Sequence, residues 1–276
     1  MEVQSPVKSC LEKYQLLIKR LKKSDCLAVA FSGGVDSTLL LKAAVDALKK
    51  EVVAITSTSC VHAGREISAA KEVALHFGVE HICFDPGMMD DKRFVENTAR
   101  RCYFCKRRMF EKMKEVLCEK GDVPLVHGVN IDDLGDYRPG LEAAQELGIS
   151  APMVEAELTK KEIRQLAAYF KLEVADKPAM SCLATRIPYG EPITEEALKK
   201  VEAAESALSE MGFYQFRVRH HGNVARIEFS ASDLKRLFEA KLLGRVVEKV
   251  KEAGYIYVAA DLEGYGQGRM NRVLDM

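Results

Sequence analysis

The residues in this sequence with the clearest capacity for chemistry form the motif SGGVDST, from Ser32 to Thr38. The motif follows an apolar run, Cys26 to Phe31, and precedes a helix-like pattern of Leu, Ala and Val. We therefore expect a buried parallel strand that ends in a glycine loop, with a helix beginning directly after the loop. The unpaired N–H groups of the first helical turn point at such a loop, and the helix dipole favours an anion there. The motif predicts a phosphate-binding site.

Each residue type in the motif suits that purpose. Gly33 and Gly34 allow backbone angles closed to other residues and a close approach to a ligand, while Asp36 can hold Mg²⁺ or cap the helix. The hydroxyl donors of the motif are Ser32, Ser37 and Thr38. The spacing fits neither G-x-x-x-x-G-K-[ST] nor G-x-G-x-x-G. It resembles the PP-loop of the ATP pyrophosphatases, which bind the pyrophosphate of ATP, whereas the plain alternative is a capped Gly-Gly turn without a ligand.

Three cysteines offer sulfur or metal chemistry. Cys102 and Cys105 form a C-x-x-C pair, and Cys182 is the cysteine of the irregular segment DKPAMSCLATRIPYGEPI. If Cys182 folds over the pair, three thiolates suit a [4Fe–4S] cluster with one iron open, because full ligation takes four. A zinc knuckle, a redox dithiol and unrelated helix-face cysteines remain equally open. The other five cysteines, which we expect to be small core residues, are Cys10, Cys26, Cys60, Cys83 and Cys118.

Arginines provide a candidate anion clamp. Arg217 and Arg219 alternate on a predicted strand, so both face the same side of it. Together with Arg186 they could bind a phosphate or a carboxylate bidentately. A solvated strand face is the simpler interpretation of the same pattern.

The elements that must position these residues alternate between strand and helix. Strands are predicted at 52–56, 81–84 and 124–127, with helices at 5–23, 65–77, 106–117, 138–147 and 159–170. This alternation predicts an α/β fold with a doubly wound parallel sheet covered on both faces. Strand C-termini line the ligand crevice of such a sheet, so Ser57 and Gly128 are predicted to flank the nucleotide.

The alternation stops near residue 180. Beyond the irregular segment, the pattern predicts a helix at 194–210, a hairpin of strands 216–219 and 224–229, further helices and a last strand, which form a small α+β domain. We therefore predict an ATP-binding domain at 1–180 and a substrate-binding or oligomerisation domain at 181–276.

Composition narrows the class of protein. Lys+Arg and Asp+Glu both number 41, and the resulting net charge of zero argues against a general nucleic-acid binder. No apolar run approaches the roughly 20 residues of a membrane span, and the polar N-terminus is not a signal peptide. Scattered cysteines without a disulfide framework favour thiols, so a cytoplasmic protein is expected.

Taken together, the motifs resemble the LarE family of ATP-dependent sulfur transferases in nickel-pincer nucleotide biosynthesis. The resemblance covers nearly the whole chain and includes SGGVDST, RCYFCK, DDLGDYRPG, SCLATRIPYG, RVRHHGNVARIE and DLEGY, in that order. It implies a PP-loop, adenine nucleotide alpha hydrolase-like domain with ATP and Mg²⁺ as cofactors. One departure is the segment from Gly264 to Arg269, GYGQGR, where the family pattern would be Gly-Tyr-Arg-x-Gly-Ser; this places a terminal phosphate contact in doubt.

The resemblance also implies a reaction. ATP adenylylates a carboxylate of pyridinium-3,5-biscarboxylic acid mononucleotide, and sulfur then displaces AMP to give a thiocarboxylate. The implied site residues are the ATP-binding residues named above, the substrate-binding arginines together with Arg138, and the three cysteines. Family members with one cysteine, matching Cys182, sacrifice it as sulfur donor, whereas members with three carry a [4Fe–4S] cluster. The trio here favours the cluster kind, with sulfide or another sulfur donor, and family members often form homo-hexamers.

Two other classes would use parts of the same pattern. A tRNA-thiolating PP-loop enzyme would use the cysteines but should carry a basic patch or an added zinc module. A non-catalytic nucleotide-binding regulator would keep the glycine loop without needing Cys182 or the arginines.

Overall fold

The computed structural model describes residues 6–121, 123–135, 139–177, 182–238, 240–266 and 268–274. The chain divides into two compact units. The first contains residues 1–88 and 102–180, and the second contains residues 89–101 and 181–276. None of the helices in the described ranges is long and apolar enough to span a bilayer.

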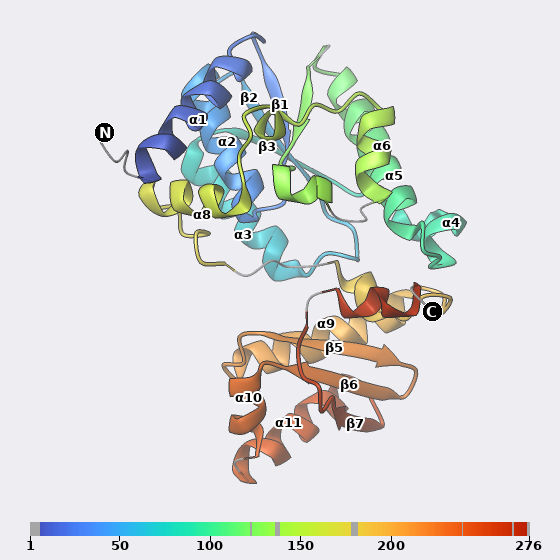
Figure 1. Cartoon of the computed structure of the whole chain (residues 1–276). Helices are drawn as coiled ribbons and strands as arrows, with labels where there is room; N and C mark the ends of the chain where they lie inside the picture. The colour runs from blue at the N-terminus through green and yellow to red at the C-terminus, as the bar shows by residue number, and fades with distance from the viewer. Residues whose placement is uncertain are drawn as a thin grey trace. The chain divides into compact units, whose positions relative to one another are not determined.

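A four-stranded parallel sheet organises the first unit (Figure 1). Its strands, in the spatial order β3-β2-β1-β4, are β3 (Glu80–Phe84), β2 (Val52–Ser57), β1 (Leu27–Ala30) and β4 (Leu125–His127). From β1 the chain moves first to β2 and β3 on one side and later to β4 on the other. The strand order therefore reverses between β1 and β4, and such a switch point opens a ligand crevice at the strand C-termini.

Helices cover both faces of this sheet, as its apolar strands require. The core of one face contains residues of α1 (Pro6–Leu21), α2 (Val35–Leu48) and α8 (Lys160–Tyr169), and that of the other contains residues of α5 (Arg101–Cys118) and α6 (Pro139–Glu146) (Figure 1). The remaining elements of this unit are α3 (Gly64–Phe77), α7 (Pro152–Glu155) and a 3₁₀ helix at Ile131–Gly135.

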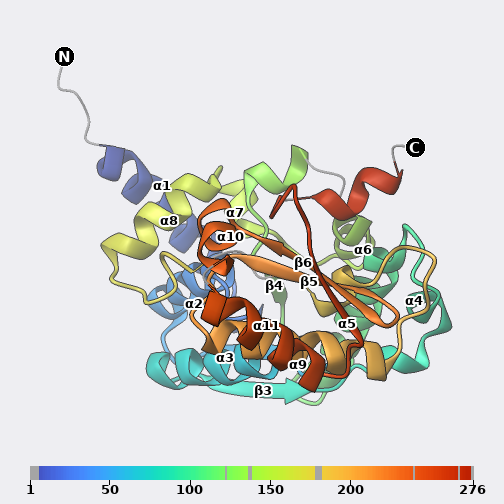
Figure 2. The same cartoon turned by 90° about the horizontal axis from the view of Figure 1, so that it is seen from below.

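The second unit is a small α+β structure. Its sheet has the order β5-β6-β7, with an antiparallel hairpin and a parallel third strand. Its strands are β5 (Phe216–His221), β6 (Val224–Phe229) and β7 (Tyr257–Ala260). The helices α9 (Glu195–Glu210) and α11 (Ala240–Glu252) lie side by side (Figure 2) and share a core with the sheet. Its shorter helices are α4 (Lys92–Val95), α10 (Ala231–Leu237) and 3₁₀ turns at Met88–Asp90, Leu183–Arg186 and Arg269–Leu274.

The predicted fold class is confirmed, with three local differences. The segment 89–101 joins the C-terminal unit, which its sequence pattern did not indicate. Helix α5 begins at Arg101, five residues earlier than predicted, so it includes the C-x-x-C pair. The expectation that the other cysteines are core residues holds for Cys10 but is wrong for Cys60, Cys83 and Cys118, which are exposed.

Candidate active site

The glycine loop between β1 and α2 has the geometry of an anion site. Gly33 has a φ of 68°, and a Cβ at this position would lie 3.1 Å from the Cα of Ala70. Both facts require glycine there. Gly34 caps α2 with an extended conformation, so the helix begins at Val35 and its first N–H groups face the loop. The sequence-predicted strand, loop and helix are thus all present.

Two of the predicted hydroxyls hold the loop in shape. Ser37 Oγ donates to the carbonyl of Gly34 at 3.1 Å and accepts from the backbone N–H of Ser32 at 3.3 Å. The two serine oxygens are 3.1 Å apart, which is within hydrogen-bond distance. Ser32 and Ser37 therefore bond to each other across the glycines and fix the loop conformation.

Two other predicted hydroxyls have no protein partner. Thr38 Oγ1 and Ser57 Oγ are buried and accept or donate no hydrogen bond within the described part of the chain. The two residues are only 2% and 6% exposed. Leaving a buried hydroxyl unsatisfied costs about 1–3 kcal/mol. Thr38 follows β1 and Ser57 ends the neighbouring strand β2, so a polar ligand at this edge would satisfy both. These orphaned atoms fit a bound nucleotide.

Gly128, predicted beside the nucleotide, packs directly on the phosphate loop. A Cβ at this position would lie 3.0 Å from the backbone N and 3.1 Å from the Cα of Ser37, and 3.2 Å from the carbonyl carbon of Asp36. Distances of 3.0–3.4 Å are tighter than nine in ten real Cβ contacts, so a Cβ here would force the backbone apart by a few tenths of an ångström. The segment after β4 therefore requires glycine in order to meet the start of α2.

The Asp36 carboxylate lies in a polar cluster on the first unit. Lys160 donates its Nζ to Oδ2 as an ion pair, and Asn130 Nδ2 lies 3.4 Å from Oδ1. The backbone N–H of Lys160 also donates to Asp132 Oδ2 at 2.7 Å, which fixes the start of α8 against the segment after β4. A carboxylate at the N-terminus of α2 suits Mg²⁺ bound to a nucleotide, with Lys160 as a second cation for its phosphates.

Cys102 and Cys105 lie in the first turn of α5, three residues apart and therefore on one helix face. Both thiols are half-buried. The next residue, Lys106, lies near two half-buried histidines, His62 and His127. Burial, and secondarily the Lys106 charge, lowers the pKa of each imidazole to about 4, so both histidines are neutral at pH 7.

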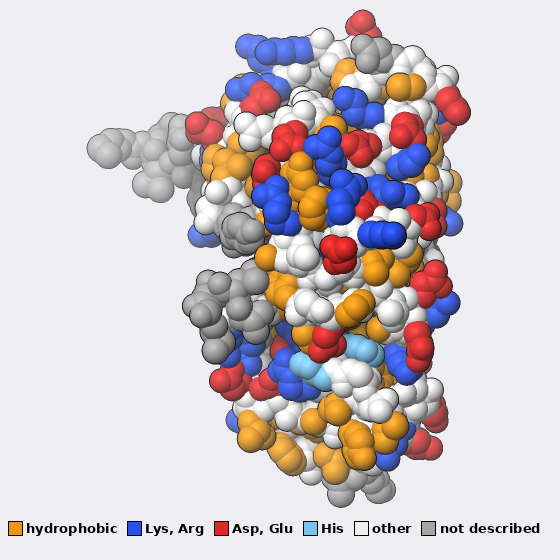
Figure 3. All heavy atoms as spheres, turned by 90° about the vertical axis from the view of Figure 1, so that its right-hand side faces the viewer, with side chains coloured by type: hydrophobic (Ala, Val, Ile, Leu, Met, Phe, Trp, Pro, Cys, Tyr) orange, Lys and Arg blue, Asp and Glu red, His pale blue; other side chains and the backbone are white. Residues whose placement is uncertain are grey.

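Charges on the α5 side of the first unit are mixed in sign, with lysine and arginine lying among aspartate and glutamate (Figure 3). Arg107, for example, pairs with Glu111 at 3.0 Å and with Glu146 at 2.8 Å, and Lys112 pairs with Glu115 at 2.5 Å. This face therefore does not present the single-sign basic surface that nucleic-acid binding favours.

Cys182 lies in the second unit, where it immediately precedes the 3₁₀ helix Leu183–Arg186. Its carbonyl accepts three hydrogen bonds: from the N–H of Thr185 at 2.9 Å, from Thr185 Oγ1 at 2.7 Å and from Arg186 Nη1 at 3.2 Å. The backbone at Cys182 is thus held firmly. No group of three or more His, Cys, Asp or Glu side chains in the described ranges is arranged to hold a metal ion.

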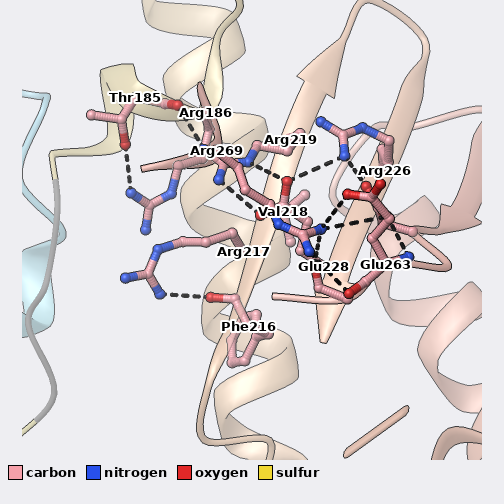
Figure 4. A network of polar contacts seen from close by, with 12 residues as sticks. Thr185, Arg186, Phe216, Arg217, Val218, Arg219, Arg226, Glu228, Glu263 and Arg269 are labelled. Atoms are coloured by element: carbon pink, nitrogen blue, oxygen red, sulfur yellow. Dashed lines mark hydrogen bonds and ion pairs between the residues drawn. The ribbon is translucent and has the colours of Figure 1, made fainter. Parts of the chain in front are cut away.

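Two of the predicted substrate arginines are held by carboxylates, and Figure 4 shows the pair of Arg219 and Glu228. Arg186, 1% exposed, binds Glu205 through Nε at 2.8 Å and Nη2 at 2.9 Å. Arg219 binds Glu228 in the same bidentate way, at 3.0 and 2.8 Å. Its Nη1 donates to the carbonyl of Thr185 at 3.0 Å, which links β5 to the segment after Cys182.

Arg217, on the same strand as Arg219, contacts an aromatic ring and a backbone carbonyl. Its guanidinium lies over the Tyr265 ring at 5.1 Å, and Nη1 donates to the carbonyl of Phe216 at 2.7 Å (Figure 4). Burial lowers the pKa of Arg217, and the nearby charges of Arg186 and Arg219 lower it further. The three predicted arginines therefore gather within one unit, and a bound anion would relieve their repulsion.

The sequence of this chain is similar to those of several known proteins. The asparagine synthase family model matches residues 16–95, which include the glycine loop. A pyridinium-3,5-bisthiocarboxylic acid mononucleotide synthase from Lactiplantibacillus plantarum is 32% identical over 263 residues, which cover 95% of each chain. The chain belongs to the LarE family.

Two further relatives match different shares of this LarE-family protein. An uncharacterized protein from Synechocystis is 40% identical over 91% of this chain and 93% of its own. The tRNA-specific 2-thiouridylase MnmA from Rickettsia felis is 30% identical, over 56% of this chain and 53% of its own. The prediction of a PP-loop enzyme of the sulfur-transferring class is thereby confirmed.

Two residues of the site in this LarE-family protein, Lys160 and Asn130, were not predicted from its sequence. Lys160 and Asn130 lie far along the chain from Asp36, and the only local signal was the capping box that begins α8 at Thr159, T-K-K-E. Arg138, a predicted substrate ligand, lies outside the described residues. Residues 264–269 depart from the family pattern, and there the Arg269 side chain donates to the carbonyls of Gly264 at 2.6 Å and Glu263 at 3.1 Å.

Proposed function

We propose that this protein is an ATP-dependent sulfur transferase that converts pyridinium-3,5-biscarboxylic acid mononucleotide to its thiocarboxylate form. The observation that carries the proposal is the full-length match to the Lactiplantibacillus synthase, which spans both units. The match to a thiouridylase extends over 56% of the chain only. We therefore take the substrate from the Lactiplantibacillus synthase, whose match includes the unit that carries the arginines as well as the glycine loop.

The first step is adenylylation, which makes a poor electrophile reactive. A substrate carboxylate oxygen attacks the α-phosphorus of ATP, the bond to the bridging oxygen of the β-phosphate breaks, and pyrophosphate leaves with that oxygen. The N–H groups at the start of α2 bind the phosphates. Thr38 and Ser57 supply the hydroxyls that are otherwise unsatisfied. Asp36 would hold Mg²⁺, and an ion bound there would supply positive charge for the departing pyrophosphate.

Substrate recognition is assigned to the arginines of the second unit. Arg217 makes the direct contact with a phosphate or carboxylate of the mononucleotide. Arg186 and Arg219, fixed by Glu205 and Glu228, add positive potential without the entropy cost of ordering a free side chain.

The second step is sulfur insertion. A sulfur nucleophile attacks the acyl carbon, the acyl–oxygen bond breaks, and AMP leaves with that oxygen. We propose that Cys102, Cys105 and Cys182 would hold a [4Fe–4S] cluster, and that this cluster would carry the sulfide that is transferred. Three thiolates suit this role because full ligation of such a cluster takes four, so one position would remain for sulfide. Use of Cys182 itself as a sacrificial sulfur donor is the second candidate.

The sulfur step is tested by the three cysteine variants. Under the cluster proposal, anaerobic protein contains about four irons per chain, and loss of any one cysteine stops sulfur transfer but not ATP binding. Added sulfide then supports repeated turnover. Under the sacrificial scheme, Cys182→Ala alone is inactive, turnover stops after one cycle, and Cys182 becomes dehydroalanine, which mass spectrometry detects.

The whole function is tested by supplying ATP, Mg²⁺, sulfide and the biscarboxylic mononucleotide. The expected products are pyrophosphate, AMP and a mononucleotide in which sulfur replaces oxygen. Pyrophosphate release that required tRNA instead of the mononucleotide would refute the proposed substrate, and ATP binding without any turnover would favour a regulator.

We also propose that the protein forms a homo-oligomer through the second unit. Its edge strand β7 and the adjacent residues carry exposed apolar side chains, including Tyr257 at 64% and Leu262 at 87% exposure. An open apolar strand edge is a template for pairing with another chain. Light scattering on the purified protein measures the number of chains directly, and a monomer at micromolar concentration would refute this proposal.

A further inference from the structure

The segment that carries Cys182 is held by a short stretch distant from it in sequence. Residues 89–101 form part of the second unit, although residues on either side of them belong to the first. Two backbone hydrogen bonds join this stretch to the Cys182 segment: Gly190 N–H to the carbonyl of Asn97 at 3.0 Å, and Ile193 N–H to that of Val95 at 2.9 Å.

Asn97 is the centre of this contact. It is fully buried and has a φ of 53°, a left-handed conformation that asparagine tolerates better than most residues. Its Nδ2 donates to the carbonyls of Pro188 at 2.7 Å and Glu191 at 2.8 Å. One side chain therefore fixes two points of the loop beyond the 3₁₀ helix.

Arg101 extends the contact toward Cys182. The side chain is 1% exposed, and Nη1 donates to Asn97 Oδ1 at 2.6 Å and to the carbonyl of Ala184 at 3.0 Å. Its guanidinium lies over the Tyr189 ring at 5.2 Å. Ala184 is in the 3₁₀ helix that begins directly after Cys182, so Arg101 anchors that helix while Asn97 orients Arg101.

We propose that Asn97 and Arg101 are positioning residues that fix Cys182 for sulfur transfer, an inference that rests on the proposed function. The Cys182 carbonyl is bonded by Thr185 and Arg186 within the 3₁₀ helix, and Arg101 ties that same helix to the 89–101 segment. The position of the Cys182 thiol therefore depends on the position of this 3₁₀ helix. A displacement of about 1 Å at a reacting group can lower a rate about 100-fold, so a buried anchor at this point controls the sulfur step.

The two half-reactions should respond differently when Asn97 or Arg101 is replaced. The hydrogen bonds described above for Asn97 and Arg101 are all made within the second unit, whereas the glycine loop and the Thr38 and Ser57 hydroxyls belong to the first. Their replacement should slow sulfur insertion and leave the formation of the acyl-adenylate, measured as pyrophosphate release, unchanged.

The decisive variant is Arg101→Lys, which keeps the charge but loses the planar guanidinium that donates from Nη1 to Asn97 and Ala184 and lies over the Tyr189 ring. Arg93→Lys is the matched control, because Arg93 lies in the same segment with its side chain 56% exposed. We expect Arg101→Lys to lower the rate of thiocarboxylate formation about 10- to 100-fold with an unchanged substrate KM and unchanged pyrophosphate release. The control should match the wild type in all three measurements.

A second measurement does not depend on activity. Hydrogen exchange at the amides of Gly190 and Ile193 should accelerate in Asn97→Ala, because both amides donate to the 89–101 segment. Equal loss of both half-reactions in Arg101→Lys, or wild-type rates of both, would overturn the positioning role. Wild-type protein that makes no thiocarboxylate would instead refute the proposed function, and the exchange experiment would still report on the contact.

Discussion

Gly128→Ala should damage the phosphate loop, although Gly128 is 91 residues away from Ser37 in sequence. The added Cβ would lie 3.0, 3.1 and 3.2 Å from three backbone atoms of Ser37 and Asp36, whereas ordinary contacts begin at 3.4 Å. The start of α2 or the segment after β4 must therefore move by about 0.2–0.4 Å, the difference between those distances. Backbone atoms in a packed loop cannot rotate away as a side chain would.

Overpacking of this kind costs about 1–3 kcal/mol of the free energy of unfolding. The displaced atoms are also those whose N–H groups are proposed to bind phosphate, so we expect the affinity for ATP to fall about tenfold, or about 1.4 kcal/mol. Urea denaturation gives the first quantity and isothermal titration with ATP the second. Gly135→Ala is the matched control, because a Cβ there meets nothing within 4 Å. If the two variants had equal stability and equal ATP affinity, the close approach of Gly128 would have no consequence and the reasoning would be wrong.

Three further predictions concern the first unit. Thr38→Val and Ser57→Ala should weaken ATP binding in titration but leave the free energy of unfolding of the ligand-free protein unchanged or higher, because each removes an unsatisfied buried hydroxyl; a loss of stability would contradict this. Lys160→Ala should slow pyrophosphate release in a coupled assay about tenfold or more, since its ammonium is proposed to bind the phosphates; an unaffected rate would restrict Lys160 to its ion pair. The unfolded chain protonates His62 and His127 near pH 6.5 and the folded chain near pH 4, so the free energy of unfolding should fall with decreasing pH, by about 1.6 kcal/mol for each histidine between pH 6.5 and pH 5. Urea titrations at both pH values measure the difference, and a pH-independent midpoint would refute the burial of the imidazoles.

The sequence alone determined the phosphate loop and the order of the elements around it. The loop is a local structure, because Gly33 requires its positive φ and the helix that follows begins at Val35 whatever lies elsewhere. The alternation of short β-branched runs with helical patterns likewise predicted a parallel sheet, since only helices on both faces can bury such strands. The resemblance to the LarE family could likewise be recognised from the sequence, because its motifs are short local patterns that follow one another in the same order.

The start of α5 was not predictable from local pattern. The residues Cys102, Tyr103 and Phe104 have modest intrinsic helix preference, so periodicity indicated a helix only from Lys106 onward. In the structure, Tyr103 is 8% exposed and donates its hydroxyl to Glu146 at 2.6 Å, in a helix that begins at Arg101. Tertiary packing therefore places both C-x-x-C cysteines on one helix face.

Only the tertiary structure decided which distant groups meet. Lys160 reaches Asp36 across 124 positions. Glu205 and Glu228 hold Arg186 and Arg219, two of the arginines that the sequence suggested as an open clamp. The segment 89–101 is tied to the C-terminal unit by hydrogen bonds of Val95, Asn97 and Arg101. Such contacts are chosen by packing and by the need to pair buried charges and amides, and both are properties of the folded chain that no local pattern encodes.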